Sequence, residues 1–130
     1  MRCRLRQASY TIVVIAGLCA LPACVGGKYP RGYAIRTGGD AKRGAQVITQ
    51  YRCGACHMIP GIRDAHGLVG PPLMMFGRRT FIGGEAPNTP ENLVRWIQSP
   101  QSIEASTAMP TLGLTEQQAR DAAAYLYTLR

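Results

Sequence analysis

The chain has 130 residues, of which 46% are hydrophobic, and a formal net charge of +8, so we expect one ordinary folded domain. Three of its 15 basic residues precede residue 24; without them the balance is 12 against 7, or +5, which describes a moderately basic surface and excludes a nucleic-acid-binding stripe. Three of the five cysteines lie within the first 24 residues, which leaves no disulfide framework for the rest of the chain.

The N-terminal residues have the pattern of an export signal. Three arginines within the first six residues are followed by an uncharged, mostly apolar run over residues 10–23, which is shorter than a typical membrane-spanning helix. The run ends in Leu21-Pro22-Ala23-Cys24, which resembles the lipobox of bacterial lipoproteins. We therefore expect residues 1–23 to be a lipoprotein-type signal peptide and Cys24 to be lipidated. A plain secretory signal cut nearby is the alternative.

A glycine-rich stretch then leads into the first predicted helix. Residues 24–38 predict a flexible tether, and residues 39–130 predict the folded domain. Asp40 is a good N-cap for a helix that begins at Ala41. One face of this helix collects residues at helical spacing, namely Gly44, Val47, Ile48 and Tyr51.

That helix leads to the segment Cys53-Gly54-Ala55-Cys56-His57. Two cysteines three residues apart, with a histidine directly after them, form the attachment pattern of c-type haem. On one helical turn both sulfurs reach the vinyl groups of one porphyrin edge, and His57 then offers a ring nitrogen to the iron. A redox disulfide would need a βαβ context, and a structural zinc site needs four ligands, for which His66 is the only further candidate. The pattern predicts one covalent haem c held by Cys53 and Cys56.

Glycine and proline interrupt the chain after this motif, and two further helices are predicted. Thr89 as N-cap, with Pro90 and Glu91 in the first turn, predicts a helix that ends at Ser99-Pro100. Thr115–Gln118 forms a capping box that opens the last helix. Since no stretch of any length alternates like a strand, the predicted fold class is all-α. The apolar faces expected of these helices comprise Leu93, Trp96 and Ile97, and Ala119, Ala122, Ala123 and Leu126.

The order of these motifs resembles class I cytochrome c: a helix, CxxCH, Gly-Pro-x-Leu, a tryptophan helix, Met-Pro and an Ala-Tyr-Leu helix, all within residues 39–130. Residues 87–97 are similar, nearly residue for residue, to the cytochrome c domain of subunit II of bacterial caa3-type haem-copper oxidases. This chain would differ by being free-standing, with a lipid anchor in place of a copper-binding module. The resemblance implies the class I fold, with three or four helices around a covalently bound haem. It also implies a close crossing of the first and last helices at Gly44 and Tyr125.

The resemblance implies that Met109 is the sixth iron ligand, opposite His57. A neutral thioether favours ferrous iron, so His–Met ligation raises the reduction potential. The competing ligands are less well placed. Met58 is adjacent to His57 and cannot reach the other face, Met74-Met75 falls where the family packs a loop against the haem edge, and His66 lies in a polar loop where we expect solvent exposure.

Further haem contacts follow from the same resemblance. Pro71 resembles the proline whose carbonyl accepts a hydrogen bond from the second nitrogen of the proximal histidine, and Leu73 resembles the leucine that covers the proximal haem face. Arg78 or Arg79, together with Trp96, resemble groups that bind the haem propionates. The residues do not decide between the two arginines.

With protein ligands at both axial positions, no substrate binds the iron, so the expected function is electron transfer, without catalytic residues. The family likeness implies a quinol-oxidising complex or another cytochrome as donor and a terminal oxidase as acceptor. It places the protein on the periplasmic face of a bacterial membrane, held by its lipid anchor. The alternative is a haem enzyme or gas sensor with a displaceable sixth ligand; a structural accessory subunit is a third, weaker idea.

Overall fold

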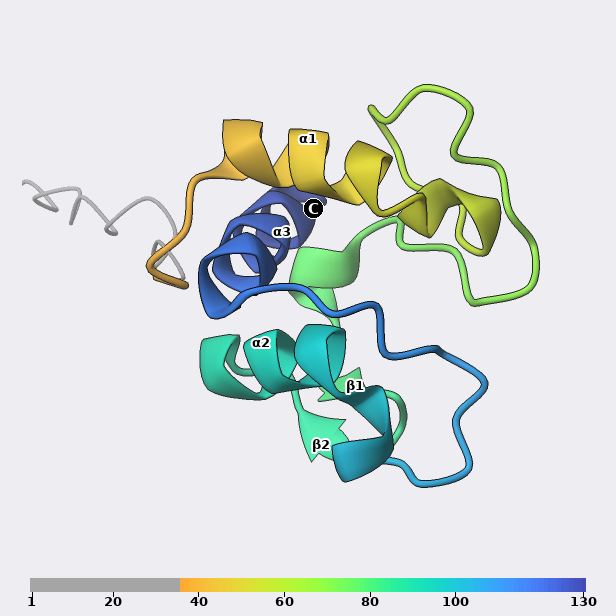
Figure 1. The fold of residues 1–130 in the computed structure, drawn as a ribbon, viewed down its shortest axis with the longest axis vertical. Coiled ribbons are helices and arrows are strands. Elements are labelled where there is room, and N and C mark those ends of the chain that lie inside the picture. The colour runs from red at the N-terminus through yellow and green to blue at the C-terminus, as the bar shows by residue number, and fades with distance from the viewer. Residues whose placement is uncertain (1–35) are drawn as a thin grey trace, which may run out of the picture. The chain divides into compact units, whose positions relative to one another are not determined.

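The computed structural model describes residues 36–130, so the predicted signal peptide, Cys24 and most of the tether lie outside the described residues. Within this range the chain is mainly helical (Figure 1). Strands β1 (Phe81–Ile82) and β2 (Ala86–Pro87) form a short antiparallel pair, with Ile82 opposite Ala86. The helices are α1 (Ala41–Gln50), α2 (Pro90–Gln98) and α3 (Glu116–Thr128), with the 3₁₀ turns η1 (Cys53–Ala55), η2 (Phe76–Arg78) and η3 (Pro100–Ser102).

Side-chain caps determine where the three α-helices begin. The Asp40 carboxylate accepts a hydrogen bond from the Arg43 amide at 2.8 Å, which starts α1. Thr89 caps α2 with proline in the first turn, and Thr115 forms a reciprocal capping box with Gln118 at the start of α3. The predicted helix starts are confirmed. None of the helices within residues 36–130 has the length and apolar character needed to cross a lipid bilayer.

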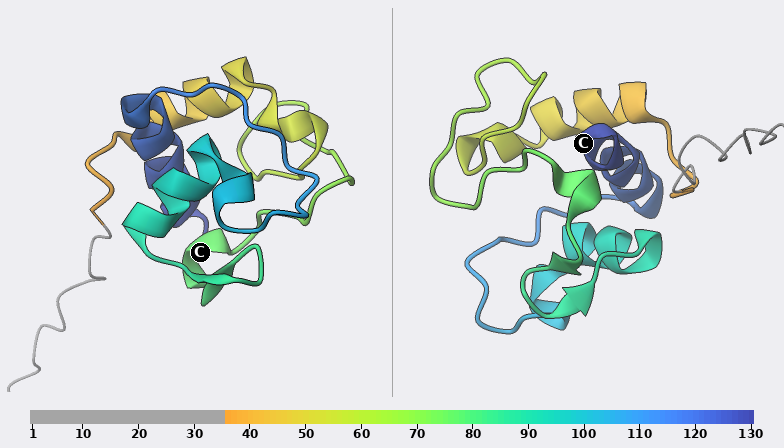
Figure 2. Two further views of the ribbon diagram at one scale, coloured as in Figure 1. Left: turned by 60° about the horizontal axis from the view of Figure 1, so that its bottom comes forward. Right: turned by 180° about the vertical axis from the view of Figure 1, so that it is seen from behind.

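Helix α1 lies directly across α3 (Figure 2). A β-carbon added at Gly44 would collide with the Asp121 carbonyl, and it would lie 2.9 Å from the β-carbon of Tyr125. Glycine is therefore what permits the two backbones to approach. On the same side, the Tyr125 hydroxyl donates to the Pro60 carbonyl at 2.6 Å. The predicted crossing at Gly44 and Tyr125 is present.

A buried carboxylate ties the start of α1 to α3. Asp121 is only 3% exposed and accepts two hydrogen bonds from the Arg43 guanidinium, both at 2.9 Å, and one from the Asp40 amide at 2.7 Å. Thr37, which the sequence places in the tether, is also buried, and its hydroxyl donates to the Arg120 carbonyl at 3.0 Å. The packed part of the chain therefore includes Thr37.

The bonds from Arg43, aided by those from Asp40 and Gln117, lower the pKa of Asp121 to about 2 from an ordinary value of 3.8. A depressed pKa in the folded state stabilises the protein above pH 4, and this stabilisation is lost as the pH falls from about 4 to about 2. Asp121→Asn should lower the free energy of unfolding at pH 7 by about 1–2 kcal/mol, since Arg43 is partly screened by solvent.

Urea unfolding of both proteins at several pH values measures this contribution. The difference between wild type and Asp121→Asn should shrink towards zero near pH 2, whereas other acid-sensitive groups are common to both proteins and cancel. A difference that stays constant from pH 7 to pH 2 would contradict the assignment of the stabilisation to the ionised carboxylate.

The core of the domain lies between the helices and the η2 turn. Phe76 is buried and meets Tyr127 edge to face, with ring centroids 6.2 Å apart. Asn88 joins the surrounding segments, because its amide donates to the carbonyls of Phe76 and Arg79 and its oxygen accepts from the Tyr127 hydroxyl at 2.9 Å. The α2 residues in this core are Leu93, Val94 and Ile97, and those of α3 are Ala119, Ala122, Ala123, Leu126 and Tyr127.

Candidate haem-binding site

A single tight turn carries both cysteines and the histidine of the motif. Arg52, in the left-handed region with φ 53°, ends the run of α1 and redirects the chain into η1. The carbonyl of Cys53 then accepts hydrogen bonds from the amides of Cys56 (3.3 Å) and His57 (3.0 Å). Both cysteines are free and half-buried. The turn thus presents two thiols and an imidazole within five residues, as covalent haem attachment requires.

The surroundings of the thiols disfavour the two other uses of cysteine pairs. Burial raises the pKa of the Cys53 thiol, which opposes the thiolate that redox disulfide chemistry needs. Within residues 36–130, no group of three or more histidine, cysteine or acidic side chains is placed to hold a metal ion. The part of the chain that the structure describes therefore offers no structural zinc site around Cys53 and Cys56.

The histidine ring is oriented by its neighbours. Nδ1 of His57 lies 2.8 Å from the Pro71 carbonyl, and because a carbonyl can only accept, this nitrogen carries the proton and donates. Nε2 is therefore left with its lone pair, which is the form that binds iron. Gly70 lies against the ring, and a β-carbon there would come within 2.6 Å of Nδ1. The residues present fit haem iron, which Nε2 of His57 would bind.

The loop that follows the CxxCH motif is hydrogen-bonded back to the motif. Gly67 donates to the Gly54 carbonyl at 3.0 Å, and Gly70 donates to the Cys56 carbonyl at 2.8 Å. Between these two contacts, Leu68 and Val69 are each 80% exposed. Two apolar side chains therefore face solvent directly beside the cysteines, although apolar residues of this size are usually buried.

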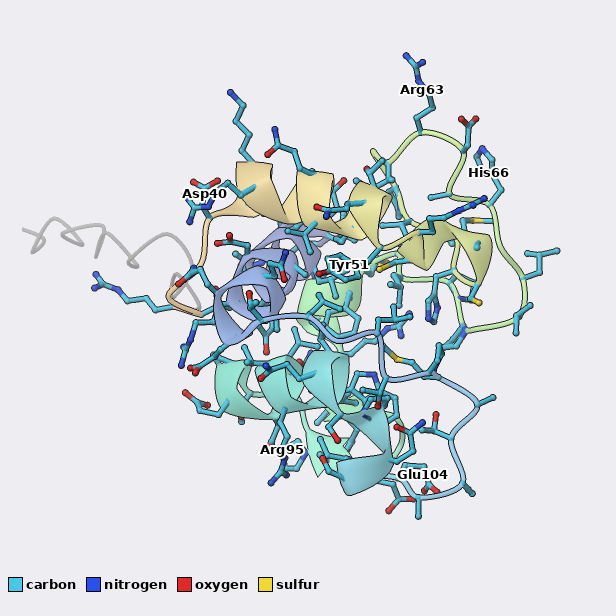
Figure 3. The ribbon with its side chains drawn as sticks, viewed as in Figure 1. Asp40, Tyr51, Arg63, His66, Arg95 and Glu104 are labelled. Carbon is cyan, nitrogen blue, oxygen red and sulfur yellow. The ribbon has the colours of Figure 1, made fainter. Side chains whose placement is uncertain are left out.

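Earlier in this loop, before Gly67, Figure 3 shows Arg63 and His66 on its outer side. His66 is exposed, as the sequence predicted, and its backbone pairs with that of Met58. Met74 and Met75 are 49% and 52% exposed.

Met109 lies in the segment between η3 and α3. This segment and the CxxCH turn lie at the same end of the domain in each view (Figures 1 and 2). Met109 is half-buried, its amide donates to the Thr107 hydroxyl at 3.3 Å, and its carbonyl accepts from the Gln101 amide at 2.6 Å. Its role as the sixth ligand stays a prediction.

The remaining predicted haem contacts surround the proximal segment. Leu73 is half-buried, and its amide donates to the Met58 carbonyl at 2.8 Å. The Arg79 guanidinium donates to the Pro72 carbonyl and stands 5.3 Å from the centre of the Phe76 ring. Arg79 thus holds the segment that accepts the hydrogen bond from the histidine, a role that was not predicted from the sequence.

The other two residues expected at the propionates differ in environment. Arg78 is exposed on η2, whereas Trp96 is half-buried and packs against the core. Propionate binding by Arg78, Arg79 and Trp96 stays a prediction.

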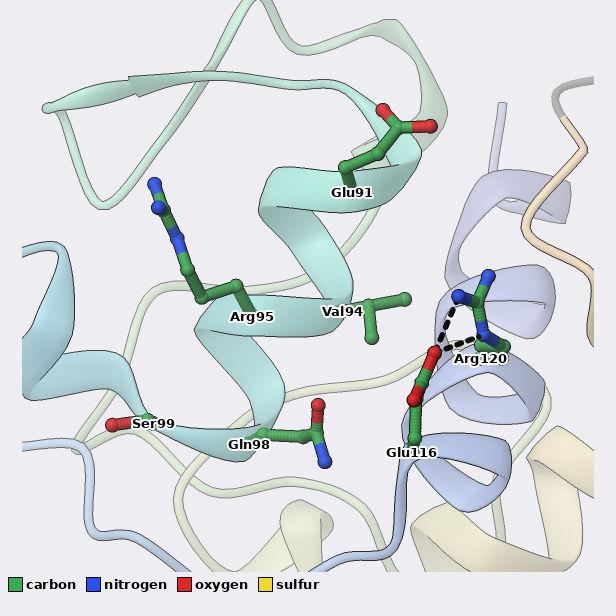
Figure 4. Close-up of a pocket in the computed structure, with 7 residues that line it drawn as sticks. All are labelled: Glu91, Val94, Arg95, Gln98, Ser99, Glu116 and Arg120. Atoms are coloured by element: carbon green, nitrogen blue, oxygen red, sulfur yellow. Dashed lines mark hydrogen bonds and ion pairs between the residues drawn. The ribbon is translucent and has the colours of Figure 1, made fainter.

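A hollow elsewhere on the surface is lined by none of the predicted site residues. It has a volume of about 390 Å³ and lies between α2 and α3 (Figure 4). Charged side chains line it, among them Glu91 and Arg95, and Arg120 is paired with Glu116 at its wall. Because it is shallow and no residue of the CxxCH turn lines it, we assign it no part in the chemistry.

Two free cysteines on one turn, followed by an oriented histidine, form the pattern expected of a protein that carries haem covalently. The chain belongs to the cytochrome c family, because the family model described as "Cytochrome c" matches residues 41–130. The all-α class I cytochrome c fold predicted from the sequence is thereby confirmed, and the family implies covalently bound haem c.

Relatives bear out the more specific resemblance. The chain is 35% identical over 91 residues to cytochrome c oxidase subunit 2 of Alkalihalophilus pseudofirmus, covering 69% of this chain and 26% of that protein. It is 33% identical over 94 residues to cytochrome c oxidase subunit 2 of Bacillus sp. strain PS3, with the same coverage. The protein of that name from Bacillus subtilis is 31% identical over 71 residues. The chain therefore spans about a quarter of the length of the first two relatives.

Proposed function

We propose that this protein is a single-haem electron carrier of a membrane-associated respiratory chain that passes electrons to a terminal oxidase. The observation that carries the proposal is the hydrogen bond from His57 to Pro71, which leaves Nε2 free beside the two attachment cysteines. Covalently bound haem supplies reversible one-electron exchange. Membership of the cytochrome c family and the names of the relatives support this assignment.

Each site residue has a role in this proposal. Cys53 and Cys56 hold the haem, and His57 and Met109 are the axial ligands. Pro71 keeps the histidine in the tautomer that leaves Nε2 free, which also raises the basicity of that nitrogen. We assign Leu73 to the proximal haem face, and Arg78, Arg79 and Trp96 to the propionates. With both axial positions taken, these residues leave no place for a substrate on the iron.

The surface beside the cysteines supports partner contact at this end of the domain. Leu68 and Val69 are each 80% exposed next to the attachment turn, and two adjacent apolar side chains at the surface suit contact with a partner protein. We propose that a quinol-oxidising complex or another cytochrome delivers electrons here and that a terminal oxidase receives them. The relatives carry the name of an oxidase subunit, which favours the oxidase as acceptor.

The second candidate is a haem enzyme or gas sensor with a displaceable sixth ligand. The observation that favours it is that Met109 lies in a loop whose described hydrogen bonds to other segments come from Gln101 alone. Absorbance of the haem-loaded protein, reduced and with or without carbon monoxide, separates the two. An electron carrier should be low-spin and six-coordinate, with a spectrum that carbon monoxide changes little. A high-spin wild type that binds carbon monoxide avidly would overturn the electron-carrier proposal.

Covalent attachment has its own test. Loss of all colour in acid-organic extraction would overturn covalent attachment.

We also propose that Cys24 carries a lipid anchor on the periplasmic face of a bacterial membrane. The support is the sequence Leu21-Pro22-Ala23-Cys24 after a basic and apolar leader. Wild-type protein should fractionate with membranes, and Cys24→Ser should lose acylation and remain uncleaved or be cleaved elsewhere. Several acyl chains on one cysteine would give stable attachment, whereas a single chain binds weakly. An intact mass showing an unmodified N-terminus in the mature wild type would refute lipidation.

A further inference from the structure

We propose that Gln101 is a positioning residue for the loop that carries Met109. Its side-chain amide bridges two points of that loop and so sets how firmly Met109 stays on the iron. The Nε2 group donates to the Met109 carbonyl at 2.6 Å, and the Oε1 atom accepts from the Thr111 hydroxyl at 2.9 Å. The inference rests on the axial role proposed above for Met109.

The base of this bridge is anchored in the core. Gln101 belongs to η3, and its neighbour Pro100 is among the largest fully buried side chains of the described residues. The Pro100 carbonyl accepts hydrogen bonds from the amides of Ile103 and Glu104, both at 3.0 Å. Because the backbone of this turn is held in place, the two hydrogen bonds of Gln101 tie the loop to a fixed point and so act as a restraint, although ordering the glutamine side chain offsets part of their stabilisation.

The loop that carries Met109 has few other hydrogen bonds. Among the hydrogen bonds described for residues 36–130, those of Gln101 are the ones that join residues 108–112 to another segment. The Met109 amide bonds locally to Thr107, and Pro110 has no amide hydrogen to donate. Contact with the core resumes at Leu114, which is buried and whose carbonyl accepts from Gln98. Gln101 therefore restrains both sides of Pro110 at the point where the loop is otherwise free.

This restraint affects an equilibrium that can be measured. In ferric protein, hydroxide competes with the thioether as the pH rises, and a looser loop gains more entropy on release, so Met109 is displaced at lower pH. The single lysine of residues 36–130, Lys42, lies in the first turn of α1, at the end away from the CxxCH turn. Among the groups of residues 36–130, this leaves no lysine beside the CxxCH turn, and the competitor in question is hydroxide.

The test is an alkaline titration of the haem-loaded ferric protein, followed by its sulfur-to-iron absorbance band. Gln101→Glu is isosteric and can still accept from Thr111, but it places a carboxylate against the Met109 carbonyl. Loss of one hydrogen bond should weaken Met109 ligation roughly 3- to 10-fold, which lowers the midpoint pH by about half a unit to one unit. Ferrous Gln101→Glu should also bind carbon monoxide faster. Thr111→Val, which removes the other contact, should show a smaller shift in the same direction.

Two matched variants separate positioning from general loosening. Gln98→Glu removes the same kind of bond at Leu114, and Gln46→Glu adds the same charge at an exposed position in the middle of α1. Both should keep the wild-type midpoint, even if Gln98→Glu lowers the free energy of unfolding.

The outcomes are distinct. A Gln101→Glu midpoint equal to that of the wild type, or an equal shift in Gln98→Glu, overturns the role of Gln101 and leaves the electron-carrier proposal standing. A wild type without the sulfur band overturns the axial role of Met109, and the role of Gln101 with it.

Discussion

Met109→Ala in the haem-loaded protein should abolish the weak near-infrared sulfur-to-iron band of the oxidised form and allow carbon monoxide to bind the ferrous iron readily. Removal of the thioether leaves water or hydroxide to occupy the distal position, and both favour ferric iron over ferrous. The reduction potential should therefore fall by a sizeable part of the roughly 0.8 V range over which axial ligands set haem potentials. Absorbance spectra and a redox titration measure these changes. Weak peroxidase activity is a further expected consequence, since the iron becomes open to peroxide.

The matched controls are Met74→Ala and Met75→Ala, because each removes a thioether from a side chain that is about half exposed. Both should retain the band and the potential. Retention of the sulfur band in Met109→Ala, together with its loss in either control, would transfer the axial role to residues 74–75.

Gly44→Val should lower the free energy of unfolding by about 3 kcal/mol or more, since the new side chain meets the backbone of α3 at Asp121 and the β-carbon of Tyr125. Backbone atoms cannot move aside as the end of a flexible side chain can, so the helices must separate. The cost of a β-branched residue within a helix is smaller, at most about 0.7 kcal/mol. Urea unfolding of the haem-loaded protein measures the difference.

Ala45→Val, one position along α1, is the matched control, because it adds the same side chain to the same helix at a half-exposed site. Its effect should stay below about 1 kcal/mol. If the two variants prove equally stable, close contact between α1 and α3 is not what selects glycine at position 44.

The features that could be predicted from sequence are those whose causes are local. Asp40, Thr89 and Thr115 cap helices through hydrogen bonds to amides three residues further on, so the residues that determine each start are neighbours in the chain. The CxxCH turn is equally self-contained, since all its chemistry lies within five residues. Proline at 71 could be placed only through the family resemblance, because the hydrogen bond from His57 spans 14 residues.

The features that sequence did not reveal depend on distant partners. In the sequence, Asp121 looks like an ordinary surface charge on the last helix. In the structure it is buried and accepts hydrogen bonds from Arg43 and Asp40, which lie 78 and 81 residues away in the chain. Gln101 is an exposed glutamine after a proline, and nothing near it indicates that its partners lie eight and ten residues on. The β1–β2 pair is also invisible, because two residues per strand are too few to show alternation.

The crossing of α1 and α3 also constrains the order of folding. The two helices lie at opposite ends of the domain's sequence, residues 41–50 and 116–128, so their contacts close a long loop. During synthesis from the N-terminus, the face of α1 formed by Gly44, Val47 and Ile48 stays without its partner until the last helix has been made. The turn with Cys53 and Cys56 emerges early and therefore remains open through most of this interval. An attachment enzyme would find both cysteines accessible on an unfolded chain, and closure by the final helix would complete the fold around the bound group.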